Sequence, residues 1–103
     1  MNLAAVNKKQ AKEVSRVFKS FSHPTRLLVL CRLSEGPCTV QELQDATGLE
    51  QAPTSQFLAR LRAEGRVQSA RDGKKVFYSL TDERLIELMK TLLRLYCDPK
   101  RKT

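Results

Sequence analysis

Three cysteines, Cys31, Cys38 and Cys97, are the side chains best suited to covalent or metal chemistry. An odd count in a chain without secretory features favours free, metal-bound or redox-active thiols over structural disulfides. The chain has no Cys-x-x-Cys and no cysteine with an evident general base close by in sequence, so we expect neither an enzyme nor a cofactor. Cys38 precedes a predicted helix start, where the helix N-terminus lowers a thiol pKa. We expect it to be an exposed bystander.

An excess of positive charge is the second chemical feature. The chain has 19 Lys and Arg against 11 Asp and Glu, a net charge of +8. Residues 51–80 contribute six basic and two acidic side chains, a net +4. A basic segment suits a polyanion, because neutralised phosphates release their counterions. Charge alone leaves open a basic protein without such a partner.

The length of 103 residues suits one domain over 1–103, with a basic tail at about 98–103. A hydrophobic content of 41% is sufficient for a packed core. The chain has no run of roughly 18 apolar residues and no apolar leader with a cleavage site. We therefore expect a cytoplasmic protein without a membrane partner.

Helical spacing of apolar residues predicts helices at about 7–21, 24–34, 40–47 and 52–64. Pro24 is suited to the first position of the second helix, and His23 to its start. Thr39 and Glu42 form a capping box before the third helix. Gly48 lies in the short turn between the third and fourth helices, and Gly65 is suited to end the fourth. These two short helices predict a helix-turn-helix.

The period of the apolar residues changes after Gly65. Val76, Tyr78 and Leu80 alternate with other residues, and Asp72-Gly73 predicts a hairpin turn in which both residues take positive φ. A last helix follows from about 81 to 96 and is apolar on nearly all sides, so we expect part of it to pack against a second copy. A larger intramolecular core is the alternative. The predicted fold class is mainly α with a small β-hairpin: a winged helix-turn-helix.

Three motifs carry a resemblance to a known family. They are Ser22-His23-Pro24-Thr25-Arg26-Leu27, the segment Gln51 to Arg62 with its polar run Thr54-Ser55-Gln56, and Gly73-Lys74-Lys75-Val76-Phe77-Tyr78-Ser79-Leu80. Together and in this order, over roughly Phe18 to Cys97, they resemble the ArsR family of bacterial winged-helix repressors. Two positions depart from it: Phe57, where members often have His, and Pro53, which is unusual in that helix.

The resemblance implies a homodimer formed through the first and last helices. Each subunit would place its fourth helix in a major groove of double-stranded DNA, and the dimer would read an inverted-repeat operator. Carried over by position, the DNA-binding residues are Gln51, Thr54, Ser55, Gln56 and Arg60 on the helix, with Arg71, Lys74 and Lys75 on the wing. Gln and Arg suit base edges, whereas Lys and short hydroxyls suit the backbone.

The signal that such a repressor reads is indicated by its cysteines. The arsenic- and cadmium-sensing type has two cysteines where this chain has Thr39 and Gln41, and the zinc type uses His on the last helix, which this chain lacks. We therefore predict no metal site. The pair Cys31 and Cys97 resembles the branch of sulfide- and persulfide-responsive repressors that includes the biofilm-growth repressor and the haemolysin regulator.

That branch implies a redox-sensing pair. Reactive sulfur species would join Cys31 and Cys97 through a disulfide or a polysulfide bridge, and the repressor would release its operator. Attack requires a thiolate, for which Arg32 and Arg94 could supply positive charge. The alternatives are two inert, buried cysteines, a thiol-independent regulator of virulence genes and, less favoured, a metal-responsive repressor.

Overall fold

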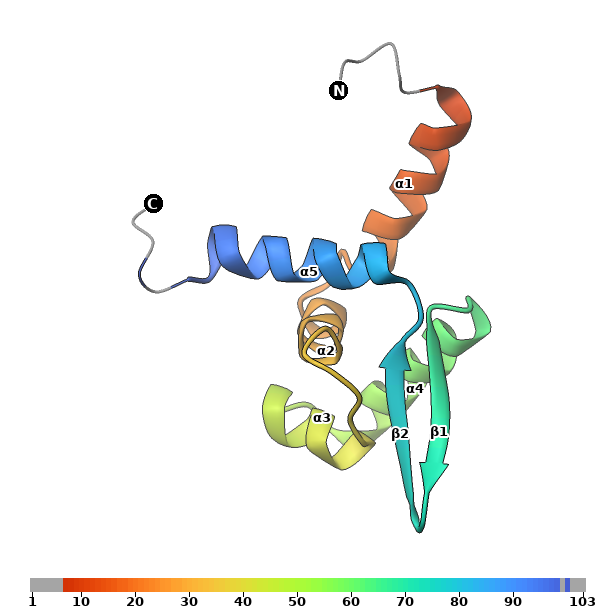
Figure 1. The fold of residues 1–103 in the computed structure, drawn as a ribbon, viewed down its shortest axis with the longest axis vertical. Coiled ribbons are helices and arrows are strands. Elements are labelled where there is room, and N and C mark those ends of the chain that lie inside the picture. Colours follow the sequence, from red (N-terminus) through yellow and green to blue (C-terminus); the bar gives the residue numbers. More distant parts are fainter. Residues whose placement is uncertain (1–6, 99, 101–103) are drawn as a thin grey trace.

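The computed structural model describes residues 7–98 and residue 100. The chain runs through α1 (Lys8–Ser20), α2 (Pro24–Leu33), α3 (Val40–Thr47), α4 (Gln51–Ala63), β1 (Val67–Asp72), β2 (Lys75–Leu80) and α5 (Glu83–Tyr96), as Figure 1 shows. The strands form a two-stranded antiparallel hairpin. This architecture confirms the predicted fold class.

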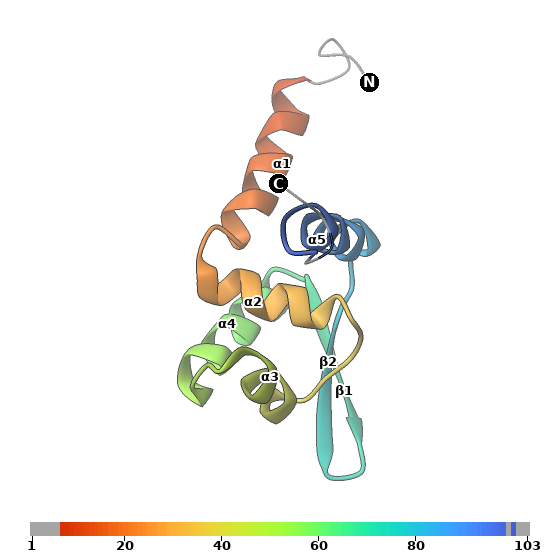
Figure 2. The same ribbon diagram turned by 90° about the vertical axis from the view of Figure 1, so that its left-hand side faces the viewer.

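Helix α2 is the central element of the fold. It begins as predicted, with Pro24 at its first turn and the Thr25 amide donating to Nδ1 of His23 at 3.2 Å. Its buried residues Leu30 and Leu33 belong to the hydrophobic core. It packs against α3, α5 and β2, so it lies between the helix-turn-helix and the last helix (Figure 2).

Local sequence fixes the ends of α3 and α4. The Thr39 hydroxyl accepts from the Glu42 amide while the Glu42 carboxylate accepts from the Thr39 amide, which confirms the capping box. Gly48 ends α3 in the left-handed conformation, with φ of 73°. After α4, Gly65 has φ of 74° and the Arg66 amide donates back to the Leu61 carbonyl at 2.9 Å, the bond of a Schellman motif.

The hairpin turn differs from the prediction by one residue. Asp72 pairs with Lys75 in the strand register, so Gly73 and Lys74 form the turn. Gly73 has φ of 64°, whereas Asp72 and Lys74 do not have positive φ. Positive φ at the first turn position alone is what a type II′ turn requires, and it matches the twist of the strands.

The base of the hairpin is tied to the helices. The Thr81 amide and hydroxyl donate to the Arg66 and Gly65 carbonyls at 2.9 and 2.7 Å. Cys38, just before α3, forms an antiparallel bridge with Tyr78 through two backbone hydrogen bonds of 3.0 and 2.8 Å. The wing is therefore fixed relative to α3 at its root, while its tip extends away from the helices (Figure 1).

The first helix reaches the core only at its last turn, where the half-buried Val17 packs against it. Helix α1 has no buried residue and extends away from the other helices in both views (Figures 1 and 2). The Cα radius of gyration is 15.0 Å, larger than the about 13 Å of a compact domain of this size. Helix α5 crosses α2 and fully buries Leu85 and Met89, while its other apolar residues are partly exposed.

Candidate DNA-binding interface and cysteine pair

Helix α4 exposes most of the side chains predicted to contact DNA. Leu58 and Leu61 are buried and hold the helix against the core. Gln51, Ser55, Gln56 and Arg60 are all exposed. An exposed polar face on the second helix of a helix-turn-helix is suited to enter a major groove.

Thr54 is an exception, and the prediction that it faces DNA is wrong. Its side chain is completely buried, and its hydroxyl donates to the Glu50 carbonyl at 2.8 Å. Thr54 lies three residues before Phe57 and four before Leu58, which are both buried, so all three share the inner face of α4. The polar run 54–56 suggested that all three side chains face solvent. A threonine in a helix can nevertheless be buried, because its hydroxyl can donate a hydrogen bond to the backbone carbonyl one turn earlier.

The wing presents the predicted basic residues. Arg71 lies near the end of β1, Lys74 lies in the turn and Lys75 begins β2, and all three are exposed. The hairpin projects beyond the helix-turn-helix as a narrow arm (Figure 1). Exposed cations on such an arm can reach phosphates beside the groove that the helix enters.

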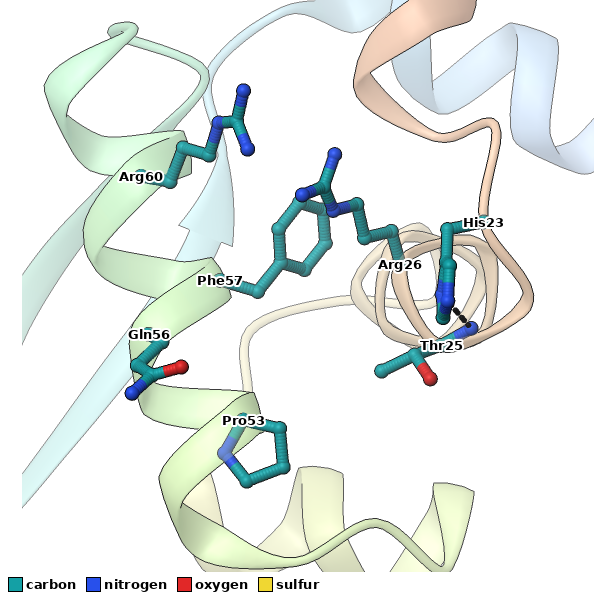
Figure 3. Close-up of a pocket in the computed structure, with 7 residues that line it drawn as sticks. All are labelled: His23, Thr25, Arg26, Pro53, Gln56, Phe57 and Arg60. Carbon is teal, nitrogen blue, oxygen red and sulfur yellow. Dashed lines mark hydrogen bonds between the residues drawn. The ribbon is translucent and has the colours of Figure 1, made fainter.

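A hollow between α2 and α4 was not predicted. It is lined by the beginning of α2 and by one flank of α4, and the residues are His23, Thr25, Arg26, Pro53, Gln56, Phe57 and Arg60 (Figure 3). The Arg26 guanidinium lies over the Phe57 ring, 5.5 Å from its centroid. Arg26 belongs to the motif Ser22-His23-Pro24-Thr25-Arg26-Leu27, which supports the family resemblance but assigns no role to this arginine.

The two cysteines of the predicted pair occur on packed elements. Cys31 lies on α2 and is partly exposed, while Cys97 follows α5 and is exposed. Burial raises the pKa of the Cys31 thiol, and the negative charge of a Cys97 thiolate raises it further. The two cysteines are 97 − 31 = 66 residues apart in sequence, but α2, which holds Cys31, packs against α5, which Cys97 follows.

We expected Arg32 or Arg94 to place positive charge beside Cys31, but neither arginine is among the groups that shift the pKa of its thiol. The negative charge of Glu35 raises the pKa of the Cys31 thiol a little further. Arg32 instead lies 3.9 Å from Glu35 in an i,i+3 ion pair. Cys31 is therefore mainly a neutral thiol at pH 7.

Cys38 was wrongly predicted to be exposed. Its side chain is completely buried, and its backbone forms the bridge to Tyr78. Burial raises the pKa of its thiol, and this effect exceeds the opposing influence of Arg32. Cys38 is thus a small core residue at the root of the wing.

Within residues 7–98 and 100, no three His, Cys, Asp or Glu side chains come together where they could hold a metal ion. In the same part of the chain, no helix is both long and apolar enough to cross a membrane.

A polar recognition helix beside a basic hairpin defines the class of winged helix-turn-helix DNA-binding proteins. The family model for the bacterial regulatory proteins of the arsR family matches residues 23–69. Curated relatives more than 30% identical extend the similarity over most of the chain. The chain belongs to the ArsR family of transcriptional regulators, which are not enzymes.

Three relatives show how far the similarity extends. The transcriptional regulator YgaV of Escherichia coli (strain K12) is 43% identical over 88 residues, 84% of this chain and 89% of the relative. The structure of the transcriptional repressor BigR from Xylella fastidiosa aligns with a TM-score of 0.80 at 38% identity, covering 88% of this chain and 93% of that one. Reduced HlyU from Vibrio cholerae N16961 gives 0.81 at 32% identity, covering 88% and 96%.

Proposed function

We propose that the protein is a homodimeric repressor that binds an inverted-repeat operator and releases it when reactive sulfur species join Cys31 to Cys97. The observation that carries this proposal is the packing of α2, which holds the half-buried Cys31, against α5, which the exposed Cys97 follows. The name of one similar structure specifies a reduced form of that regulator, which is consistent with thiol chemistry there. A DNA-binding repressor acts where the chromosome is, so we place it in the cytoplasm.

The apolar surface of α1 and α5 supports the dimer. Val14 and Phe18 on α1 are 51% and 49% exposed, and Tyr96 on α5 is 76% exposed. Apolar side chains of Val17, Phe18 and Leu88 line a groove between α1 and α5. A second copy covering this groove would bury surface that one subunit leaves in water.

The sensing reaction uses a persulfide as the oxidant. The exposed Cys97 thiolate attacks the outer sulfur of R–S–SH, which forms Cys97–S–SH and releases R–S⁻. The Cys31 thiolate then attacks the Cys97 sulfur, so the disulfide forms and hydrosulfide leaves. In total, two thiols and one persulfide yield one disulfide, one R–SH and one H₂S. If a second persulfide contributes its outer sulfur, the product is a trisulfide bridge and a second R–SH.

The bridge acts on DNA binding through α2. A disulfide requires Cα atoms within about 7 Å, so its formation constrains the end of α2 against the end of α5. Helix α2 packs on α3, and its N-terminal turn lines the hollow beside α4. A change at Cys31 therefore shifts both helices of the helix-turn-helix relative to the dimer helices, and this alters the spacing of the two recognition helices.

The roles at the DNA follow from exposure and chemistry. Gln56 reads base edges in the major groove, and Gln51, Ser55 and Arg60 hold the backbone at its border. Arg71, Lys74 and Lys75 bind phosphate or enter the minor groove. All seven side chains are exposed.

The test compares Cys31→Ser and Cys97→Ser with Cys38→Ser as the matched control. The probe is an inverted-repeat duplex enriched from a random pool by the reduced protein. A persulfide donor abolishes binding by wild type and Cys38→Ser but not by the other two variants. Intact mass spectrometry of the same samples shows the loss of two hydrogen atoms when a disulfide forms. Each sulfur atom inserted into the bridge adds the mass of one sulfur. An unaltered response in both Cys31→Ser and Cys97→Ser overturns the proposal.

A second candidate is a thiol-independent regulator of virulence genes. It is favoured by the raised pKa of Cys31, which keeps that thiol neutral and slow to react. A similar protein is named as a transcriptional activator, HlyU of Vibrio cholerae, at 36% identity. Equal operator affinity with and without reductant, and after a persulfide donor, selects this candidate.

A further inference from the structure

Two arginine side chains line the hollow between α2 and α4, beside the face of α4 that is proposed to read DNA. The volume of the hollow is about 350 Å³, and its lining includes Arg26, Arg60 and His23 but no acidic residue. Figure 3 shows both guanidinium groups at the same end of the hollow, one extending from each helix. An open, acid-free site with two guanidinium groups is suited to an anion.

Arg26 is held in place without an acidic partner. Its guanidinium stacks over the Phe57 ring at 5.5 Å, and Phe57 itself is 6% exposed and belongs to the core. None of the four ion pairs among the described residues includes Arg26. A cation that an aromatic ring orients, and that no carboxylate neutralises, is available to an external anion.

Arg60 can bind an anion if it gives up its ion pair with Glu64. Its Nε lies 3.4 Å from the Glu64 carboxylate, in an i,i+4 pair whose side chains are 60% and 36% exposed. Such exposed pairs are weak, since water and salt screen them. A phosphate that approached between Arg26 and Arg60 could therefore displace Glu64 from the guanidinium.

The position of the hollow indicates which anion it meets. Pro53, Gln56, Phe57 and Arg60 follow one another at helical spacing along a single flank of α4. This flank lies between the buried face and the exposed face with Ser55. When α4 enters a major groove, its flanks lie next to the sugar-phosphate backbones that border that groove.

We propose that the hollow binds one backbone phosphate of the operator, with Arg26 as the principal ligand and Arg60 as the second. The proposal rests on the proposed placement of α4 in the major groove. Arg26 comes from α2, so it holds the backbone while Gln56 reads the bases. The contact also attaches to DNA the helix that carries Cys31.

The test measures how salt weakens the binding of duplex DNA by Arg26→Gln, Arg26→Lys and Lys90→Gln. Lys90 is exposed on α5 but does not line the groove proposed for the second copy, so it serves as a control for the loss of one charge. The probe is the duplex enriched by the reduced wild-type protein. Loss of one phosphate contact reduces the slope of log K against log salt by about 1 per bound subunit. We expect this reduction in Arg26→Gln, with wild-type slopes in Arg26→Lys and Lys90→Gln.

A duplex with single methylphosphonate substitutions locates the contact. One neutralised phosphate at the groove border lowers wild-type affinity by about tenfold but has no further effect on Arg26→Gln. Arg26→Gln weakens binding to all sequences alike, because a phosphate contact carries no base information. A changed base preference, or additive losses at every phosphate, overturns the proposal. Circular dichroism melting confirms that each variant is folded.

The failure of this inference is distinct from that of the proposed function. If wild type binds DNA and responds to persulfide while Arg26→Gln has the same salt slope as Lys90→Gln, only the phosphate site is wrong. If the wild-type protein ignores duplex DNA at low salt, the binding mode itself is wrong. Retention of the phosphate contact with no persulfide response removes only the sensing proposal.

Discussion

Two regions of the molecule differ in what they leave on the surface. The DNA-reading region, which comprises α3, α4 and the hairpin, buries its large apolar side chains Leu43, Leu58 and Leu61 and exposes polar and basic ones. The pairing region, which comprises α1 and α5, leaves Phe18 and Tyr96 in water. The buried apolar residues of the first region belong to the common core, and its surface suits a polyanion, whereas the second region has an exposed apolar surface that a further chain would cover.

Helix α1 shows the difference between the two regions most clearly. Its ends are set locally, since Asn7 and Gln10 form a capping box at its beginning. The helix nevertheless buries no residue. A helix of 13 residues is marginal in water by itself, because nucleation costs more than a few turns return. The helix would therefore be stabilised by the second copy that we propose to cover it.

The largest difference between the two regions should appear when a valine in each is replaced by glutamate. Val14→Glu on α1 puts a charge into the proposed dimer surface, so sedimentation should show monomers. Operator affinity should fall by about 10²–10⁴-fold, because two linked half-sites lose their mutual effective concentration. Val14 is 51% exposed, so the folded subunit tolerates the change.

Val76→Glu on the hairpin is the matched control for Val14→Glu. Val76 is 37% exposed, and the wing does not belong to the proposed interface. This variant should sediment like wild type and weaken DNA binding only through repulsion. If both variants sediment alike, the two regions do not differ as described.

The thiols between the regions give the next effect. Cys31 lies on α2, which contacts both regions, and burial and the Cys97 charge raise the pKa of its thiol. Its thiolate fraction at pH 7 is therefore small and increases with pH up to that raised pKa. Bridge formation after a persulfide donor should accelerate about tenfold per pH unit between pH 6 and 8. Stopped-flow mixing followed by intact mass measures this rate, and a rate independent of pH would contradict it.

The capping box of α3 gives a smaller effect, confined to the DNA-reading region. Thr39→Ala removes the acceptor of the Glu42 amide and should cost about 1 kcal/mol of unfolding free energy. The melting temperature should fall by about 4–8 °C in a domain of this size. Thr91→Ala, inside α5, should raise it slightly because alanine is the better helix former.

Acid should reduce the effect of Thr39→Ala. Hydrogen bonds from Thr39 lower the pKa of Glu42. A lowered pKa in the folded state stabilises the protein above the ordinary pKa of Glu, and this contribution disappears as pH falls through the lowered value. The difference between the melting temperatures of wild type and Thr39→Ala should therefore narrow in acid but not vanish, because the hydrogen bond from the Glu42 amide to the Thr39 hydroxyl does not titrate. A difference that stays constant down to pH 2 would show that the box adds nothing to the charge of Glu42.

Local signals in the sequence were sufficient for the elements but not for all of their faces. The capping box at Thr39, Pro24 at a helix start and Gly65 after α4 each depend on neighbouring residues alone, so their structures could be predicted. Helix α2 is apolar on many sides, and periodicity could not give its rotation. Leu28 on this helix is 47% exposed, while its neighbour Val29 is completely buried.

The candidate site was only partly accessible to sequence reasoning. The exposed residues Gln56 and Arg60 could be predicted because their position follows from the helix-turn-helix pattern. The burial of Cys38 depends on its bridge to Tyr78, which is 78 − 38 = 40 residues away, so no local pattern encodes it. The contact between Arg26 and Phe57 is likewise set by the packing of α2 on α4.

Thr54 and Ser55 provide the smallest and most local test, since they are adjacent on α4 but Thr54 is buried and Ser55 is exposed. Thr54→Val replaces a buried hydroxyl by a methyl group. The Glu50 carbonyl keeps a hydrogen bond from the Thr54 amide at 3.3 Å, so it is not left unpaired. The unfolding free energy should change by less than about 1 kcal/mol. Operator affinity and base preference should not change.

Ser55→Ala should have the opposite pattern. Its side chain is exposed, so stability should stay the same or rise slightly with the helix propensity of alanine. Loss of a hydroxyl at the border of the groove should weaken operator binding by a few-fold, measured by fluorescence anisotropy at fixed salt. If Thr54→Val changes base preference while Ser55→Ala does not, α4 turns a different face to the DNA. The polar residues of the DNA-reading region would then need to be assigned again.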